Sequence, residues 1–236
     1  MFVASSRLAS GITLNLIFFD IDGTLLISPG AGGRAITRIM KSTFNLSGEI
    51  ARIEIHGQTD RGIATQLFKA HGIEDSALNW KRFKNSYLEV LDEELTRAQG
   101  CLLPGIQPLL HSLQQSPTIE VALLTGNIEI AAFKKIKHFG IDQYFSWGGF
   151  GDQHRDRSDM ARAAIKLAGQ RKEINSIENV YVIGDTPNDI RCGKAINAIT
   201  IAVATASYSV EQLSDYDPDW LFPDLSDLDM ILSLLN

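Results

Sequence analysis

The sequence predicts an α/β fold in which helices cover both faces of a doubly wound parallel sheet, with a helical domain inserted after the first strand. Three observations predict it. Short, mainly apolar runs at 14–19 and 119–124 are typical of strands buried on both faces. Helical periodicity follows most of these runs, and such alternation favours a parallel sheet. The region 33–99 shows helical periodicity alone, which indicates an all-helical insertion.

The composition is that of an ordinary globular protein with one large domain and a sizeable insertion. The 236 residues are 44% hydrophobic and 21% charged, and no apolar run reaches the roughly 18 residues that a membrane span needs. A net charge of −6 without clustered Lys and Arg argues against a nucleic-acid partner. Residues 1–11 do not resemble a signal peptide, and two cysteines, Cys101 and Cys192, suit a reducing compartment. We therefore expect free thiols and a cytoplasmic protein.

The first strand, 14–19, ends in the acidic turn Asp20-Ile21-Asp22-Gly23. Ionised carboxylates at a buried strand end cost several kcal/mol each unless a metal, a cation or a proton is held there. Because side chains alternate along extended backbone, Asp20 and Asp22 point to the same side, where one can attack a substrate while the other moves protons. Asp-Gly is also a common turn dipeptide, which is the alternative interpretation.

The segment after this turn is predicted to be a separate helical domain, 28–103, inserted into a core made of 12–27 and 104–236. Its Gly-rich start, 28–33, lacks the pattern of a nucleotide-binding loop and is expected to be a flexible hinge. Three or four helices follow, and a domain of this kind beside a catalytic strand is a natural lid. The apolar positions that share the predicted helix faces are Ile36, Ile39, Met40, Phe44, Ile63, Leu67, Phe68, Leu78, Phe83, Tyr87, Leu91 and Leu95.

A polar connection at 52–61 separates the first two of these helices, with Thr59 or Asp60 as the expected helix cap. Its side chains His56, Gln58 and Arg61 either face a substrate or are solvated.

The second buried strand, 119–124, ends in Thr125-Gly126-Asn127 and is followed by a helix at 128–139. Unpaired N–H groups at the start of that helix, together with the Thr125 hydroxyl, are suited to binding an anion. Capping of the helix by Thr125 or Asn127 is the alternative.

A short third strand is expected at 144–150, before a charged loop and a helix at 160–169. The loop carries Arg155 and Arg157, and one of them can grip a phosphate through its planar guanidinium if the loop borders the site. Solvated surface is the other interpretation of these two residues.

A further strand at 180–183 ends in Gly184-Asp185, and Asp189 follows one helical turn later. These carboxylates are hard oxygen donors of the kind that Mg²⁺ prefers, and helix capping is an equal alternative. All three motifs lie at the carboxyl ends of predicted parallel strands, where α/β proteins bind ligands. The remaining elements are helices at 190–195 and 210–213, a strand at 200–204 and an edge strand at 220–222.

Taken together, these motifs resemble the four-motif signature of the haloacid dehalogenase-like (HAD) hydrolases. Asp20-Ile21-Asp22-Gly23-Thr24-Leu25 matches the family pattern D-x-D-G-T-L at every position; the later motifs are Thr125-Gly126-Asn127, a basic residue, and Gly184-Asp185 with Asp189. The chain is most similar to the phosphoglycolate phosphatase-like members, whose C1-type helical cap occupies the place of 28–103. One departure is that the third motif of the family is usually a Lys, where this chain offers Arg157 or, alternatively, Arg155.

The resemblance implies a Mg²⁺-dependent phosphatase that hydrolyses a small phosphorylated metabolite through an aspartyl-phosphate. Asp20 would be the nucleophile, and Asp22 the general acid and then the general base. Asp20, the Asp22 carbonyl and Asp185 would hold Mg²⁺, with Asp189 completing the metal site through a water or orienting the basic residue. The resemblance also implies phosphate contacts from Gly23, Thr125, Gly126, Asn127 and Arg157.

Two other functions remain open on the sequence. A phosphosugar mutase would use the same nucleophile and return the phosphoryl group to its substrate, and a catalytically silent binding protein would keep only the fold. A true dehalogenase is disfavoured because Asp22, Asp185 and Asp189 would then have no role. The sequence indicates neither a particular physiological substrate nor an oligomeric state.

Overall fold

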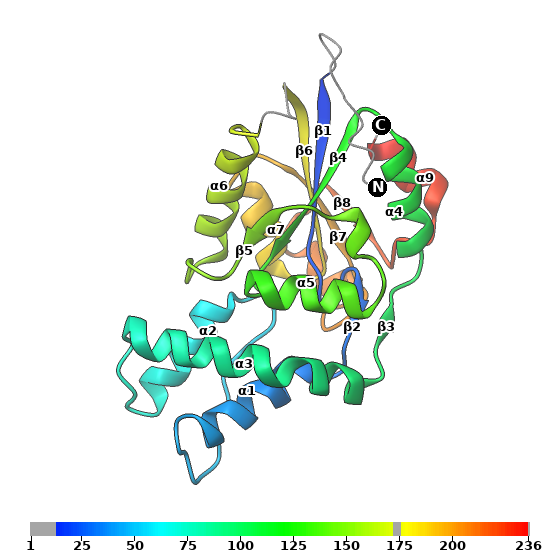
Figure 1. Cartoon of the computed structure of the whole chain (residues 1–236). Coiled ribbons are helices and arrows are strands. Elements are labelled where there is room, and N and C mark those ends of the chain that lie inside the picture. The colour runs from blue at the N-terminus through cyan, green and yellow to red at the C-terminus, as the bar shows by residue number, and fades with distance from the viewer. Residues whose placement is uncertain (1–12, 172–175, 236) are drawn as a thin grey trace, which may run out of the picture.

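The computed structural model describes residues 13–171 and 176–235, and Figure 1 shows the arrangement of their helices and strands. The prediction that residues 1–11 are not a signal peptide, and the predicted start of the core at residue 12, lie outside this part of the chain.

A six-stranded parallel sheet forms the centre of the core, and its strand order is β5-β4-β1-β6-β7-β8. The first strand is therefore internal, because Phe19 pairs with Leu123 on one side and with Ile183 on the other. This arrangement confirms the predicted doubly wound parallel sheet. The strands are β1 (Leu14–Phe19), β4 (Ile119–Thr125), β5 (Gly148–Phe150), β6 (Ile177–Gly184), β7 (Ile199–Val203) and β8 (Trp220–Phe222).

Helices cover both faces of the sheet because successive side chains of β1 point to opposite sides. Ile17 and Phe19 pack in one apolar cluster with α4 (Ile106–Gln115), α5 (Glu129–His138) and α9 (Leu228–Leu235). Leu16 and Phe18 pack in another with α6 (Arg157–Ala168) and α7 (Pro187–Lys194). Each fully buried side chain of this size contributes roughly 1.5–3 kcal/mol. The short helix α8 (Val210–Ser214) packs beside β8.

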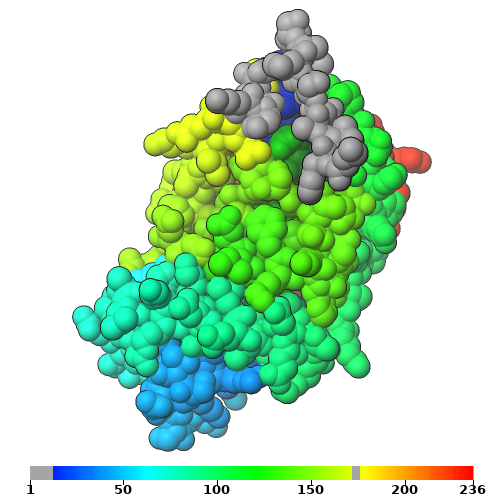
Figure 2. All heavy atoms as spheres, in the orientation of Figure 1, coloured from blue at the N-terminus to red at the C-terminus, as the bar shows by residue number. Residues whose placement is uncertain are grey.

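Three helices between β1 and β4 form a unit of their own: α1 (Ala31–Ser42), α2 (Asp60–Ala70) and α3 (Ala77–Ala98). We call them the helical unit. Its apolar cluster includes the edge-to-face pair Phe68 and Phe83, and Tyr87, which stacks on Phe83. The helical unit lies against one end of the core, next to α5 (Figures 1 and 2). Ile128 and Ala131, at the start of α5, belong to the same apolar cluster.

Two short antiparallel strands, β2 (Leu26–Ile27) and β3 (Cys101–Leu102), join the helical unit to the core. They pair with each other where the chain leaves and re-enters the core. Cys101 and Cys192 are free thiols.

Some elements differ from the sequence-based expectation. The expected connector at 28–33 ends at Gly30, because α1 already begins at Ala31. The expected strand at 144–150 is shorter: a 3₁₀ turn (Asp142–Tyr144) precedes it, and only Gly148–Phe150 pairs with β4. Leu78 is exposed on the first turn of α3. The sequence reasoning also missed α9 and the β2–β3 pair. No helix in the described ranges is both long and apolar enough to cross a membrane.

Candidate active site

Three neighbouring strands end at one edge of the sheet and bring the sequence-predicted site residues together. Asp20 directly follows β1 and Asp22 lies two residues further on, Thr125 ends β4, and Asp185 directly follows β6. Thr24 Oγ1 donates a hydrogen bond to Asp185 Oδ1 at 3.1 Å, which joins the turn after β1 to the end of β6.

Gly23 is required for this junction. Its φ of 85° lies in the left-handed region that favours glycine, and a Cβ atom at this position would overlap the Asp185 carboxylate. The glycine therefore allows the turn to lie directly against Asp185.

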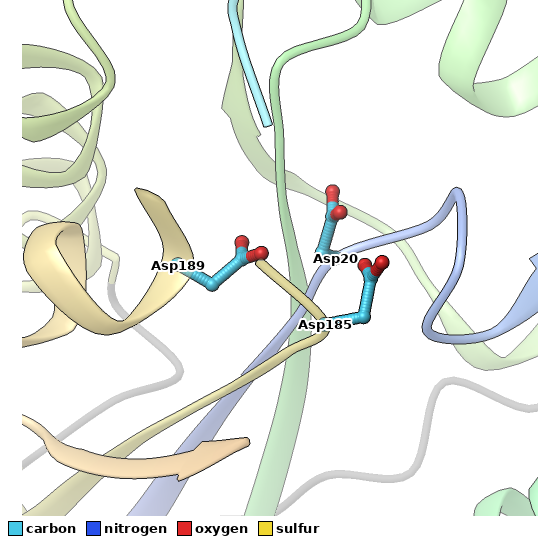
Figure 3. A group of neighbouring side chains, drawn as sticks. All are labelled: Asp20, Asp185 and Asp189. Atoms are coloured by element: carbon cyan, nitrogen blue, oxygen red, sulfur yellow. The ribbon is translucent and has the colours of Figure 1, made fainter. Parts of the chain in front are cut away.

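Asp20, Asp185 and Asp189 form a buried acidic cluster (Figure 3). The three residues are 5%, 3% and 2% exposed, and one oxygen atom from each lies within 4.8 Å of the others. Carboxylate oxygens this close can share one divalent cation. Asp20 thus lies next to Asp185 and Asp189 in space, although it is far from both in the sequence.

Asp189 is held by its own helix and by Arg157. It is the third residue of α7, where it forms a capping box with Thr186: its Oδ2 accepts hydrogen bonds from the Thr186 N–H at 3.0 Å and from the Thr186 hydroxyl at 2.6 Å. Its Oδ1 accepts a hydrogen bond from Arg157 Nη2. Because both oxygens already have donors, Asp189 is better placed to orient Arg157 than to bind an ion directly.

Arg157, and not Arg155, reaches the acidic cluster. Arg157 is the first residue of α6 and is 7% exposed, and its Nη2 lies 3.0 Å from Asp20 Oδ1 and 3.1 Å from the Leu124 carbonyl oxygen. Its Nε is buried and has no hydrogen-bond acceptor within the described part of the chain. Arg155 instead bonds to Asp75 at 2.9 Å.

Asp22 lies apart from the acidic cluster, and its side chain points to a different set of partners. Asp22 Oδ2 accepts hydrogen bonds from Asn127 Nδ2 at 2.8 Å and from Lys135 Nζ at 2.5 Å. Asn127 Nδ2 also donates to the Thr125 hydroxyl oxygen at 2.8 Å. The turn after β4 therefore orients Asp22 through Asn127.

The start of α5 is occupied, which corrects the expectation of free N–H groups there. The Ile128 N–H donates to Asp60 Oδ2 at 2.8 Å, and the Glu129 N–H donates to Asp152 Oδ2 at 3.2 Å. The sequence could not show this because Asp60 belongs to α2 of the helical unit. Thr125 is fully buried, and Thr125, Gly126 and Asn127 all line the cavity.

Lys135 is a site residue that the sequence reasoning missed. It lies on α5, is 4% exposed, and its Nζ contacts both Asp22 Oδ2 at 2.5 Å and Asn127 Oδ1 at 2.7 Å. A signal was present, because Lys135 shares the buried face of the predicted helix with Ala131 and Ala132.

A cavity of about 470 Å³ lies above these residues, between the sheet edge and the helical unit. Its walls include His56 and Gln58 from the polar connection, and Tyr87 from α3. Arg61 does not line it: the Arg61 guanidinium bonds to Asp75 at 2.6 Å and lies over the Trp80 ring.

Comparison with known proteins identifies the family. The family model for haloacid dehalogenase-like hydrolases matches residues 14–197. The chain belongs to the haloacid dehalogenase-like hydrolases. It is 25% identical over 221 residues to a phosphoglycolate phosphatase of Colwellia psychrerythraea, covering 90% of this chain and 94% of that protein. It is also 25% identical over 240 residues to 2-deoxyglucose-6-phosphate phosphatase 1 of Saccharomyces cerevisiae, covering 92% and 90%. The structure of CbbY from Rhodobacter sphaeroides in complex with phosphate has a similar fold, with a TM-score of 0.69 at 17% identity, covering 92% and 96%.

The acidic cluster of this HAD-like hydrolase carries more negative charge than Arg157 balances. Burial raises the pKa of Asp20 to about 6, with the Arg157 charge opposing the shift and the Asp189 charge adding to it. Burial and the neighbouring charges of Asp189 and Asp20 raise the pKa of Asp185 well above its usual range. A bound divalent cation would oppose these shifts because it favours the ionised carboxylates. The donor set therefore suits a divalent metal ion.

Asp22 of the hydrolase has the opposite balance. Burial pushes its pKa upward, but the Lys135 charge and the hydrogen bonds from Lys135 and Asn127 outweigh burial, so the pKa lies below its usual range. The environments of Asp20 and Asp22 thus shift the pKa values of these two carboxylates in opposite directions.

Proposed function

We propose that this hydrolase is a Mg²⁺-dependent phosphatase that cleaves a small phosphomonoester through an aspartyl-phosphate. The observation that carries the proposal is the placement of Asp20 and Asp22 at the floor of one cavity with separate partners. Asp20 lies 3.0 Å from Arg157 beside Asp185, whereas Asp22 lies 2.5 Å from Lys135. Asp20 thus lies beside a second carboxylate with which it could share a cation, whereas Asp22 lies beside a lysine.

In the first step, an Asp20 carboxylate oxygen attacks the phosphorus atom, and the bond from phosphorus to the ester oxygen breaks. The leaving oxygen takes a proton from Asp22 and departs as an alcohol. Before substrate binds, Asp22 is ionised because its pKa lies below its usual range. The negative charge of an arriving phosphate raises that pKa, so Asp22 takes up a proton from solvent.

In the second step, a water oxygen attacks the phosphorus atom of the aspartyl-phosphate while Asp22 accepts a proton from that water. The bond from phosphorus to Asp20 breaks, so inorganic phosphate leaves and Asp20 is again a carboxylate. Asp22 now carries the proton from the water and releases it to solvent as phosphate departs, because its pKa falls again. Arg157, Thr125 and Asn127 line the cavity and would bind the phosphoryl oxygens and orient them for in-line transfer.

A bound Mg²⁺ would be held by Asp20 and Asp185, with Asp189 acting through Arg157 or a water, and would stabilise negative charge on the phosphoryl group. The buried oxygen atoms within 4.8 Å of one another support this assignment. Asp22 contributes no carboxylate oxygen to that cluster, so its expected part in the metal site rests on its backbone carbonyl.

We further propose that residues 28–103 act as the lid over a core of 12–27 and 104–236. The cavity between the two supports this division, and a small phosphorylated metabolite fits its volume of about 470 Å³. The two relatives described above are named as phosphatases of small phosphorylated compounds, which supports a substrate of that class. We also propose that the enzyme is cytoplasmic and acts on neither nucleic acid nor membrane.

The test is phosphate release from a panel of phosphate esters, including an aryl phosphate, with Mg²⁺ and with a chelator. We expect turnover that needs Mg²⁺ and disappears in Asp20→Asn, because amide oxygen is a poor nucleophile. Asp142→Asn makes the same change at an exposed position and serves as the matched control. Unchanged turnover in Asp20→Asn would refute the mechanism, return of phosphate to another position of the substrate would indicate a mutase, and no turnover on any ester would indicate a binding protein.

A further inference from the structure

Lys135 is the one lysine of α5 that turns into the cavity, within the part of the chain that the structure describes. The same helix carries Lys137, which is exposed, and Lys134, which pairs with Asp92 of the helical unit. Removing an ammonium group from water costs several kcal/mol unless it is paired and hydrogen-bonded. A lysine kept at a 4% exposed position therefore needs an electrostatic partner, and Asp22 supplies it.

The contacts of Lys135 converge on one oxygen of Asp22. Lys135 Nζ lies 2.5 Å from Asp22 Oδ2, and Asn127 Nδ2 lies 2.8 Å from the same atom. Lys135 Nζ also donates to Asn127 Oδ1 at 2.7 Å, so the three side chains form a closed triangle. Two donors on a single carboxylate oxygen fix the direction of the carboxylate more tightly than one donor can.

We infer that Lys135 is a positioning residue that, together with Asn127, holds Asp22 by Oδ2 and leaves Oδ1 to face the ester oxygen and then the attacking water. The inference rests on the proposed function, because it assigns Asp22 the proton transfers described there. A misplacement of Asp22 by about 1 Å would then slow the reaction without weakening phosphate binding.

The backbone around Lys135 is itself anchored, which makes the positioning precise. Asp60 accepts the Ile128 N–H bond at the start of α5, and the Asp60 N–H donates to the Gly126 carbonyl oxygen at 2.7 Å. These two Asp60 bonds fix α2 against the start of α5. Asn127 lies next to them in the sequence, and Lys135 lies two helical turns further along α5, so the contact between Asn127 and Lys135 depends on them.

The experiment compares Lys135→Met with Lys137→Met, the same change on the exposed side of the same helix. We expect Lys135→Met to lower kcat at least tenfold on an alkyl phosphate with less than a threefold change in KM, because positioned acid–base groups contribute roughly 10²–10⁴ in rate. The loss should be smaller on p-nitrophenyl phosphate in the burst phase, since p-nitrophenolate leaves without a proton. A burst of p-nitrophenolate followed by slow turnover is expected, because the second step still needs Asp22. Lys135→Arg should recover part of kcat.

Equal kinetics for Lys135→Met and Lys137→Met would overturn the inference, and so would a tenfold rise in KM with kcat unchanged, which would make Lys135 a substrate-binding residue. A second measurement is independent of turnover. Lys135→Met should lower the urea midpoint of unfolding more when it is made in the wild-type chain than when it is made in Asp22→Asn. The Asp22→Asn chain has already lost the ion pair between Asp22 and Lys135. Equal falls in both backgrounds would show that the contact does not exist. If the wild-type chain has no turnover but the two falls in midpoint differ, the proposed function is rejected and the contact between Lys135 and Asp22 is supported.

Discussion

The Asp60 carboxylate accepts a hydrogen bond from the Ile128 N–H at 2.8 Å, so a side chain of the helical unit caps a helix of the core. The bond satisfies one of the backbone donors that a helix start leaves free. It also places a buried acid between the two parts of the molecule, at the edge of the cavity.

This placement predicts a pH dependence of stability. Burial raises the pKa of Asp60 to about 6, with the Lys135 charge opposing the shift, so the folded chain holds the proton more tightly than the unfolded chain does. Protonation of Asp60 therefore stabilises the fold fully below about pH 4, and this stabilisation, about 3 kcal/mol in size, is lost as the pH rises through about 6.

Asp60→Asn removes this titration and keeps an oxygen acceptor for the Ile128 N–H. We expect its free energy of unfolding, minus that of wild type, to be larger at pH 7.5 than at pH 4.5, because wild type alone loses stability over this range. Urea titration at both pH values measures the difference. The same difference between variant and wild type at the two pH values would contradict the prediction.

Arg157 predicts a graded series. Arg157→Gln leaves the buried carboxylates of Asp20 and Asp189 without their cation, and breaking a buried pair in this way costs about 3–5 kcal/mol. We expect loss of turnover and a lowered unfolding midpoint. Arg157→Lys keeps the charge but cannot reproduce the planar guanidinium, so we expect partial turnover and a smaller fall in the midpoint. The control is Arg155→Gln, whose partner Asp75 lies outside the cavity. Similar losses at 155 and 157 would argue against the assignment of the basic residue.

Mg²⁺ should stabilise the folded chain. A metal that binds only the folded state adds about 1.4 kcal/mol for each tenfold rise in its concentration above Kd, so Tm should rise with Mg²⁺ and fall back after chelation. Asp185→Asn removes one of the cluster oxygens and should abolish this dependence. A Tm of Asp185→Asn that still rises with Mg²⁺ as in wild type would place the ion elsewhere.

Gly23 predicts a local steric effect. Gly23→Ala puts a methyl group into the Asp185 carboxylate at a residue with φ 85°, so both strain and displacement of Asp185 are expected. Gly72→Ala is the matched control, because Gly72 has φ 64° and no atom within 4 Å of an added Cβ. Both variants should lose about 1 kcal/mol of stability from the backbone conformation, and only Gly23→Ala should also lose turnover. Equal turnover in the two variants would contradict the role of the junction.

Much of the fold follows from local patterns. The apolar runs at β1, β4 and β6 predict strands, because a strand that is buried on both faces has a nearly continuous apolar sequence. The acids that end these strands are visible for the same reason, since Asp20 and Asp185 interrupt an apolar run. The family and the sheet topology are confirmed, whereas the domain boundaries at 28 and 103 stay predictions.

The missed features depend on contacts between distant segments. From the sequence alone, Lys135 is one of several basic residues on a helix, and only the fold brings it next to Asp22. Asp60 is expected to cap its own helix, but its carboxylate caps α5. The helix α6 begins at Arg157, three residues before the expected helix, because Asp156 caps it. Likewise, the close packing of β5 is not visible in the sequence: its two glycines lie directly against the Leu123 backbone and Ala164.

The position of β1 in the middle of the sheet has a consequence for synthesis on the ribosome. Its neighbours β4 and β6 are translated only after the whole helical unit. A strand whose six residues are all buried in the folded protein is therefore made before either of the strands that pair with it. The helices α1 to α3 contact one another and are complete before β4 is translated, so they can form during that interval. A nascent chain that is halted before β4 would therefore expose β1 to chaperones while the helical unit is already folded.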